Sequence, residues 1–201
     1  MNIYTINAAL AVFAAIGLTA CSPHSTTHSD PHSNQHTEQT MTYDFTASNA
    51  ITITRSGSFD LDMTPDAALP LFTAPGEKLW IPTWEPMILN GDGFEKGTVF
   101  VTAHAGHKTY WHVMDYDTGL HHALYVRVTP GVDTGTVDVS LVPNESGGST
   151  VTVSYQLTSL STAGSTLLQK NYSAEKYAQM MEEWRSMIVG SRDKIDAHFS
   201  R

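Results

Sequence analysis

The chain has few cysteines and few basic residues, and both shortages limit what it can be. Its only cysteine is Cys21, so no disulfide can form within the chain and its stability must come from an apolar core. Lysine and arginine together number 11 against 20 aspartate and glutamate residues, which gives a formal net charge of −9. This acidic balance argues against nucleic acid or an anionic lipid surface as a partner, because both attract positive charge.

Motifs for covalent catalysis, phosphate binding and metal binding are also missing after residue 50. That region has no Gly-x-Ser-x-Gly elbow, no thiol and no phosphate-cradling glycine-rich loop. It has no paired cysteines and no His-x3-His on a predicted helix, and His104, His107 and His112 are loosely spaced. His121 and His122 are neighbours on a predicted strand, so they point to opposite faces. We therefore expect no metal and no cofactor in this region.

Cys21 ends an apolar N-terminal stretch and fits the pattern of a bacterial lipoprotein leader. The residues before it, Leu18-Thr19-Ala20, complete a lipobox, and residues 8–17 have the length of a signal-peptide apolar core. The whole apolar run, residues 8–20, is shorter than the roughly 20 residues that span a bilayer. Residues 1–7 contain neither Lys nor Arg, which departs from the usual pattern. We predict a signal peptide over residues 1–20 and a lipid on Cys21 that holds the protein to a membrane surface.

A polar segment follows over residues 21–50. It is rich in Ser, Thr, His, Asn and Gln and shows no apolar periodicity, so we expect a flexible tether. Histidines recur at every fourth position, and neutral imidazole binds zinc, nickel and copper. These histidines are His24, His28, His32 and His36. Pro23 and Pro31 disfavour the helix that would align them, so metal capture by the tether stays open as an alternative.

Alternating apolar and polar residues predict strands through most of the domain expected over residues 51–198. The alternation begins at residues 51–54, returns at 59–61 and is clearest at 150–157, where Val151, Val153, Tyr155 and Leu157 share one face. Thr64-Pro65-Asp66 predicts the start of a short helix, because Thr is a good cap and Pro fits the first helical position. Further strands are expected at residues 98–104, 109–116, 120–129 and 135–142.

The final segment changes to a helical period. Apolar side chains fall on one broad stripe after Ser173, a suitable N-cap. They are Tyr177, Met180, Met181, Trp184, Ile188 and Ile195. An antiparallel sheet needs cover for its apolar face, and only this helix is long enough to supply it. The sequence therefore predicts an α+β fold in which a curved antiparallel sheet wraps around a long C-terminal helix, with two short helices after the first strand.

Several stretches of this domain resemble the SRPBCC superfamily, which includes START lipid-transfer domains, polyketide cyclases and proteins like the birch-pollen allergen. The stretches are residues 72–77 with Trp80, Trp84, Glu85 and Pro86, and residues 110–113, 125–131, 151–155 and 180–184. The resemblance covers about residues 51–195. It implies a helix-grip fold, whose sheet and long helix enclose an apolar cavity for lipids, sterols, polyketides or other hydrophobic ligands. It implies no particular reaction.

Aromatic and methionine side chains are the candidates for lining such a cavity. They are Trp80, Trp84, Trp111, Tyr155, Met180, Trp184 and Met187. Methionine adapts to ligands of varied shape, although the same side chains at these spacings also suit a plain core. We predict a binding or carrier protein that holds a small hydrophobic molecule or lipid and is tethered to a membrane through Cys21.

An enzyme of the cyclase or dehydratase type is the main alternative, and it would need two ionisable groups that converge inside the cavity. His112 and Asp115 are candidates, but one strand places them on opposite faces. Arg127 is interpreted as a surface charge opposite Asp138. If the host has two membranes, we expect attachment to the outer one, facing the periplasm, because Ser22 is not the Asp that retains lipoproteins at the inner membrane.

Overall fold

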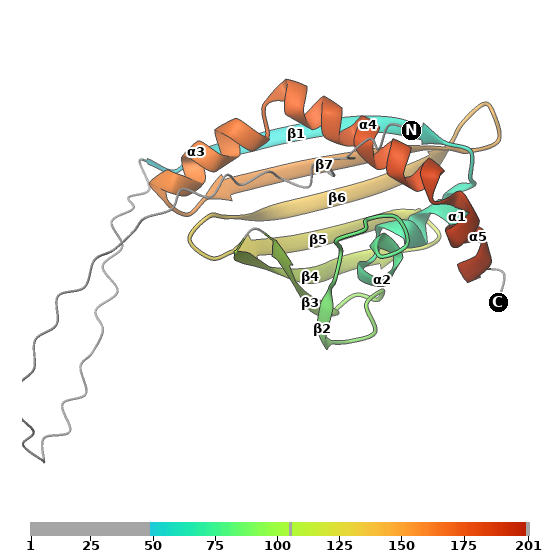
Figure 1. Cartoon of the computed structure of the whole chain (residues 1–201), viewed down its shortest axis with the longest axis horizontal. Helices are drawn as coiled ribbons and strands as arrows, with labels where there is room; N and C mark the ends of the chain where they lie inside the picture. Colours follow the sequence, from blue (N-terminus) through green and yellow to red (C-terminus); the bar gives the residue numbers. More distant parts are fainter. Residues whose placement is uncertain (1–48, 105, 200–201) are drawn as a thin grey trace, which may run out of the picture.

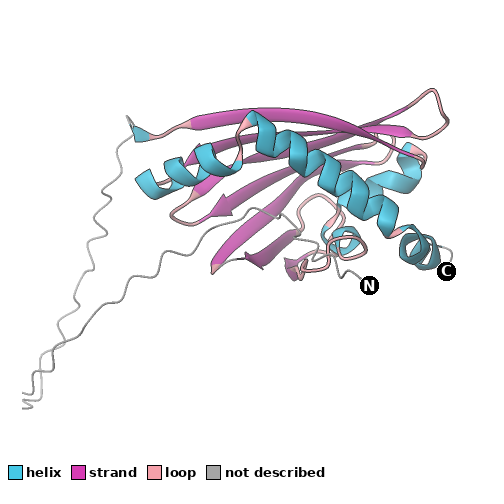
Figure 2. Ribbon diagram, turned by 45° about the horizontal axis from the view of Figure 1, so that its top comes forward, coloured by secondary structure: helices cyan, strands magenta, loops and turns pink. Residues whose placement is uncertain are grey.

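The structure is a computed structural model that describes residues 49–104 and 106–199. The predicted signal peptide, Cys21 and the four histidines of the tether lie outside the described residues. These predictions therefore stay predictions. Figures 1 and 2 show the described part as one curved sheet with helices packed along one of its faces.

Seven strands form a single sheet in the order β1-β7-β6-β5-β4-β3-β2, and every neighbouring pair is antiparallel. The strands are β1 (Thr52–Leu61), β2 (Met87–Asn90), β3 (Val99–His104), β4 (His107–Asp117), β5 (His122–Thr129), β6 (Asp133–Pro143) and β7 (Ser149–Ser159). The first strand is continuous where the sequence predicted two pieces. The edge strand β2 was not predicted, because all four of its residues are exposed and carry no alternation of burial.

The inner face of the sheet is apolar, as the alternation in the sequence predicted. On β7, Val151, Val153, Tyr155 and Leu157 are all buried, which confirms that they share one face. Gly135 on β6 lies between Arg127 and Leu157 in the strand register. A Cβ atom added there would lie 1.9 Å from the backbone oxygen of Gln156. The close approach of β7 to β6 at this position therefore requires a residue without a side chain.

Three short helical segments follow β1. They are α1 (Pro65–Ala68), the 3₁₀ helix η2 (Leu69–Phe72) and α2 (Ala74–Glu77). Thr64 caps α1 as predicted, because its side chain accepts a hydrogen bond from the Ala67 backbone nitrogen. Thr73 caps α2 in the same way through the Gly76 nitrogen. This region lies beside the sheet's middle strands (Figure 1).

The C-terminal segment contains three helices where the sequence predicted one long helix. They are α3 (Thr162–Asn171), α4 (Ala174–Gly190) and α5 (Arg192–Phe199). Tyr172 leaves the helical conformation, and Ser173 then caps α4 by accepting a hydrogen bond from the Lys176 nitrogen. The long helix α4 runs along the sheet (Figure 2). It buries four residues of the predicted apolar stripe, while Met180 is half-buried and Ile195 is buried on α5; the four are Tyr177, Met181, Trp184 and Ile188. No helix in the part of the chain that the structure describes has both the length and the apolar character needed to cross a bilayer.

Gly57 allows α4 to approach β1 closely. A Cβ atom at this position would lie 2.7 Å from Cγ of Met181 and 3.2 Å from Cε1 of Tyr177. The hydroxyl group of Tyr177 donates a 2.8 Å hydrogen bond to the backbone oxygen of Val153. These contacts fix α4 over β1 and β7, at one side of the sheet, so other groups must cover its middle strands.

We predict that Gly135→Ala destabilises the protein by about 3 kcal/mol, the upper range for adding atoms to a filled interior. The new methyl group would meet the Gln156 backbone oxygen, which cannot move without disturbing the pairing of β6 with β7. Urea unfolding followed by circular dichroism measures the loss. Gly190→Ala is the control, because nothing lies within 4 Å of a Cβ atom at that helical position. Equal stability of the two variants would contradict this account of the close approach of β7 to β6 at Gly135.

Candidate functional site

A cavity that is partly open to solvent lies between the inner face of the sheet and the helices. Its volume is about 100 Å³, taken as the space open to the centres of water-sized spheres. Strands β3 to β7 supply one wall, and α2, the segment after it and α4 supply the other. Eight of the fifteen lining residues are aromatic. These are Phe72, Trp84, Phe100, Trp111, Tyr125, Tyr155, Tyr172 and Trp184.

The aromatic walls hold one another in place by edge and face contacts. The Phe100 and Trp111 rings stack with centroids 5.8 Å apart, and Trp84 meets Trp111 edge-on at 6.2 Å. The Trp84 indole nitrogen donates a hydrogen bond to the Ala74 backbone oxygen at 2.8 Å, which ties the segment after α2 back to that helix. Of the lining residues, only Glu77, Trp111 and Met180 are partly exposed, so the cavity meets solvent beside these three.

Five of the seven predicted pocket residues line this cavity. Trp84, Trp111, Tyr155, Met180 and Trp184 are brought together there from two strands, α4 and the segment after α2. Trp80 and Met187 do not line it. Trp80 is buried in the core, where its indole nitrogen donates to the Leu71 oxygen and its ring meets that of Trp184. The half-buried Met187 packs against the core cluster one turn beyond Trp184.

Glu77, at the end of α2, is a cavity residue that the sequence did not single out. Its side chain forms no hydrogen bond with any residue that the structure describes. Glu77 is half-buried and lies among the lining residues at the place where the cavity meets solvent. Burial raises the pKa of this carboxyl group well above its usual value. Glu77 therefore supplies an unpaired acid to an otherwise aromatic cavity.

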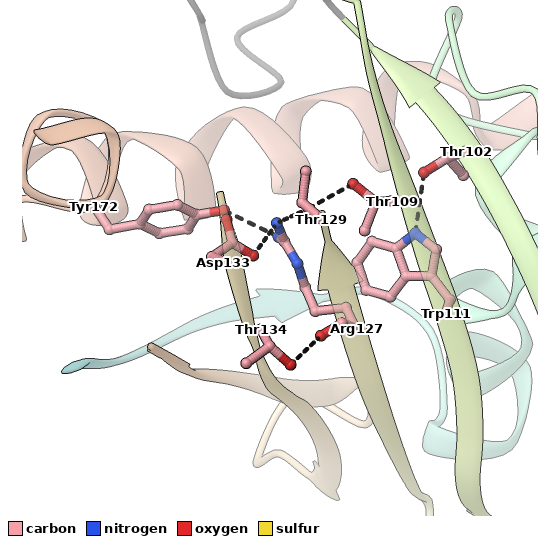
Figure 3. Close-up of polar contacts among 8 residues, drawn as sticks. All are labelled: Thr102, Thr109, Trp111, Arg127, Thr129, Asp133, Thr134 and Tyr172. Carbon is pink, nitrogen blue, oxygen red and sulfur yellow. Dashed lines mark hydrogen bonds and ion pairs between the residues drawn. The ribbon is translucent and has the colours of Figure 1, made fainter. Parts of the chain in front are cut away.

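Arg127 supplies a second polar group, and it is fixed by the protein (Figure 3). One guanidinium nitrogen, Nη2, donates to Asp133 Oδ1 at 2.8 Å and to Thr129 Oγ1 at 3.1 Å. The other, Nη1, donates to the Tyr172 hydroxyl group at 3.2 Å, and the guanidinium lies 5.3 Å from the Trp111 ring centroid. Burial raises the pKa of the Asp133 carboxyl group, and the charge of Arg127 opposes that rise.

The interpretation of Arg127 as a surface charge opposite Asp138 was wrong. Arg127 is 7 % exposed, and its strand partner on β6 is Gly135 rather than Asp138. Asp138 pairs instead with His122, whose Nε2 lies 2.9 Å from its carboxylate. Side chains two residues apart on a strand lie on the same face, and Tyr125, Arg127 and Thr129 all point inward on β5. The position of Arg127 in this alternation could have indicated that it is buried.

The histidines of the domain lie away from the cavity. Partial burial lowers the pKa of His122, but the hydrogen bonds and charges of Asp138 and Asp115 outweigh that effect and raise it. His121 lies 2.9 Å from Asp66, and His112 is exposed. Neither His112 nor Asp115 lines the cavity. Within residues 49–104 and 106–199, no three His, Cys, Asp or Glu side chains gather in a way that could hold a metal ion.

Solved structures with the same architecture confirm the helix-grip fold. Norcoclaurine synthase from Thalictrum flavum is similar with 11 % identity and a TM-score of 0.53, over 81 % of this chain and 99 % of that one. The same enzyme in complex with dopamine and hydroxybenzaldehyde matches with 13 % identity and a TM-score of 0.53, over 71 % of this chain and 90 % of that one.

A putative uncharacterised protein from Rhizobium leguminosarum is also similar, with 13 % identity and a TM-score of 0.53, over 70 % of this chain and 97 % of that one. No protein-family model and no curated protein matches the chain. At these identities the likeness establishes the fold, and the function must be argued from the cavity.

We predict that Arg127→Met lowers the free energy of unfolding by about 3–5 kcal/mol, because it leaves Asp133 buried without its counter-charge. Adding Asp133→Asn should restore part of that loss, so that the double variant loses about 1–3 kcal/mol less than the sum of the single variants. Urea unfolding of all four proteins measures this coupling.

The exposed pair Arg185 and Glu182 is the control, and Arg185→Met should change stability by about 1 kcal/mol or less. Additive losses at Arg127 and Asp133 would show that the two side chains do not stabilise each other.

Proposed function

We propose that the protein binds or carries a small hydrophobic molecule, held in the cavity between the sheet and α4. The observation that carries this proposal is the aromatic lining itself, because large side chains that pack to fill a core do not normally leave a shared void. Concave sites with mainly apolar walls and a few polar groups are the usual form of small-molecule sites. The complex of norcoclaurine synthase with dopamine and hydroxybenzaldehyde supports the proposal, since in that protein the fold accommodates small aromatic molecules.

The cavity size favours a compact ligand over a long-chain lipid. In this measure one water needs about 10–15 Å³, so the cavity holds on the order of seven to ten water-sized spheres. A molecule with one or two rings is of this size. The flexible side chain of Met180 at the mouth can adjust to ligands that differ in shape.

Acid–base catalysis on the enclosed molecule is the second candidate function, and Glu77 favours it. A carboxyl group whose pKa is raised by burial keeps its proton to a higher pH than an exposed carboxyl group does, and it can donate that proton to an enclosed molecule. Tyr125 does not share this role, because its hydroxyl group donates to the Phe72 backbone oxygen at 2.8 Å. Among the other ionisable groups of the lining, Arg127 is held by Asp133 and Tyr172, and burial raises the pKa of the Tyr155 hydroxyl group well above its usual value. Acid–base catalysis would need two ionisable groups that converge inside the cavity. A single free acid is therefore stronger evidence for ligand binding than for catalysis.

We propose in addition that a lipid on Cys21 attaches the protein to a membrane, the outer one if the host has two. The lipobox before Cys21 supports this, and residues 22–50 would then separate the folded domain from the membrane surface. Capture of metal by the histidines of that segment remains an alternative role of the tether alone.

We predict that the full chain carrying Cys21→Ser, purified without a tag, retains a small molecule in native mass spectrometry that is absent after denaturation. Val139→Phe should remove this mass excess, because Val139 lines the cavity and the larger ring occupies it. Val142→Phe places the same ring on an exposed position of the same strand and should leave the mass excess unchanged. An equal excess in both variants, or none in the parent protein, would be evidence against a ligand in this cavity.

We predict that the unaltered protein incorporates labelled palmitate and fractionates with membranes, whereas Cys21→Ser abolishes both the label and the membrane association. The reason is that Cys21 holds the only thiol available for acylation. Autoradiography and sucrose-gradient fractionation supply the two readouts. Membrane association that persists in Cys21→Ser would contradict lipid anchoring.

A further inference from the structure

Glu77 is the one charged cavity group that lacks a protein partner among the described residues. Arg127 is neutralised by Asp133, so the two add no net charge to the lining. Glu77 has no such counter-charge. A carboxyl group in an apolar site normally finds a hydrogen-bond donor or keeps its proton and stays neutral. The unmet requirement at Glu77 is therefore for a donor, ideally one with a positive charge.

No side chain that the structure describes donates a hydrogen bond to Glu77. The Tyr125 hydroxyl group donates to Phe72, and the Arg127 side chain donates to Tyr172, Thr129 and Asp133, while its Nε is buried without a partner. Lys78, the next residue in the chain, pairs with Glu85 at 2.9 Å, and Lys194 donates to the Lys78 backbone oxygen at 2.8 Å. The other ionisable groups near this part of the cavity are tyrosines. They are Tyr116, Tyr155 and Tyr172.

The aromatic walls favour the same kind of partner as the carboxylate does. Aromatic faces carry negative charge density and attract cations, and indole rings do so most strongly. Trp84, Trp111 and Trp184 all line the cavity with Glu77. The protein already uses one of these faces for a cation, because the Arg127 guanidinium lies over Trp111. The formal net charge of −9 also favours the approach of a cation over that of an anion.

We infer that the ligand carries a protonated amine that binds the Glu77 carboxylate while its apolar ring lies against the tryptophans of the cavity. The inference rests on the proposed function and names its ligand class. An anionic ligand would meet Glu77 as a like charge, and a neutral one would leave the carboxyl group without a counter-charge. The amine supplies both the charge and the hydrogen bonds that the described residues do not provide.

Three probes of matched shape test the inference by isothermal calorimetry with the full chain carrying Cys21→Ser. They are 1-naphthylmethylamine, 1-naphthalenemethanol and 1-naphthylacetate, which differ at the polar group. The amine is expected to bind about ten-fold or more tightly than the alcohol, as a charge-assisted hydrogen bond allows, and the acetate most weakly. Glu77→Gln should weaken amine binding about ten-fold and leave alcohol binding within about three-fold.

Glu85→Gln is the matched control, because Glu85 is an exposed carboxylate eight residues further along the chain and should affect none of the probes. Equal binding of amine and alcohol, tighter binding of the acetate, or unchanged amine binding in Glu77→Gln would overturn the amine inference while leaving cavity binding intact. Failure of all three probes to bind would overturn the amine inference and count against the proposed function as well.

The pH dependence of amine binding gives a test that needs no variant. Burial raises the pKa of Glu77 in the empty cavity, so its carboxyl group is neutral below that pKa and cannot pair with the ammonium group. Amine affinity should therefore increase as the pH rises through this pKa, as long as the amine stays protonated, and binding should release a proton to the buffer. Alcohol affinity should not follow this trend. A flat amine profile without proton release would contradict pairing with Glu77.

Discussion

One face of the seven-stranded sheet is apolar, and the rest of the structure depends on how that face is covered. The long helix α4 packs close to β1, where Gly57 removes the side chain that would hold it away, and Tyr177 bonds to β7. The centre of the face is left to α2 and the segment that carries Trp84. The aromatic rings of the lining are rigid, and Trp84 and Tyr125 are held by hydrogen bonds to backbone oxygens. These rings therefore cannot move into the remaining space. The cavity therefore forms because α4 covers one side of the sheet face, while α2 and the segment that carries Trp84 cover its centre.

The two charged groups of the cavity differ in what satisfies them. Arg127 is paired, stacked and hydrogen-bonded by the protein, so its contribution is to hold β5, β6 and the α3–α4 junction together. Glu77 has no such partner among the described residues, and a half-buried acid without a partner loses part of its hydration. Natural proteins depart from full internal satisfaction mainly at functional sites. This contrast is why we assign recognition to Glu77 and a structural role to Arg127.

The sequence predicted the fold well because the fold depends on periodicity. Alternation placed the inner faces of the strands, and the stripe of Tyr177, Met181 and Trp184 placed the helix that covers them. The site was predicted less completely. The sequence gives no signal that Trp80 turns toward Leu71 while Trp84 faces the void, since both are tryptophans in one irregular segment. Glu77 was missed because the sequence does not show that its carboxyl group lacks a hydrogen-bond partner. That lack can be recognised only when the partners of the neighbouring side chains are known.

The central claim is that a small molecule binds in the cavity between the sheet and α4. The chain has four tryptophans, of which Trp84, Trp111 and Trp184 line the cavity while Trp80 does not. Nuclear Overhauser effects between bound 1-naphthalenemethanol and the indole protons measure this directly. The account predicts effects to the three lining indoles and none to Trp80. Effects only to exposed side chains such as Leu89 and Leu120, or to no tryptophan at all, would contradict it.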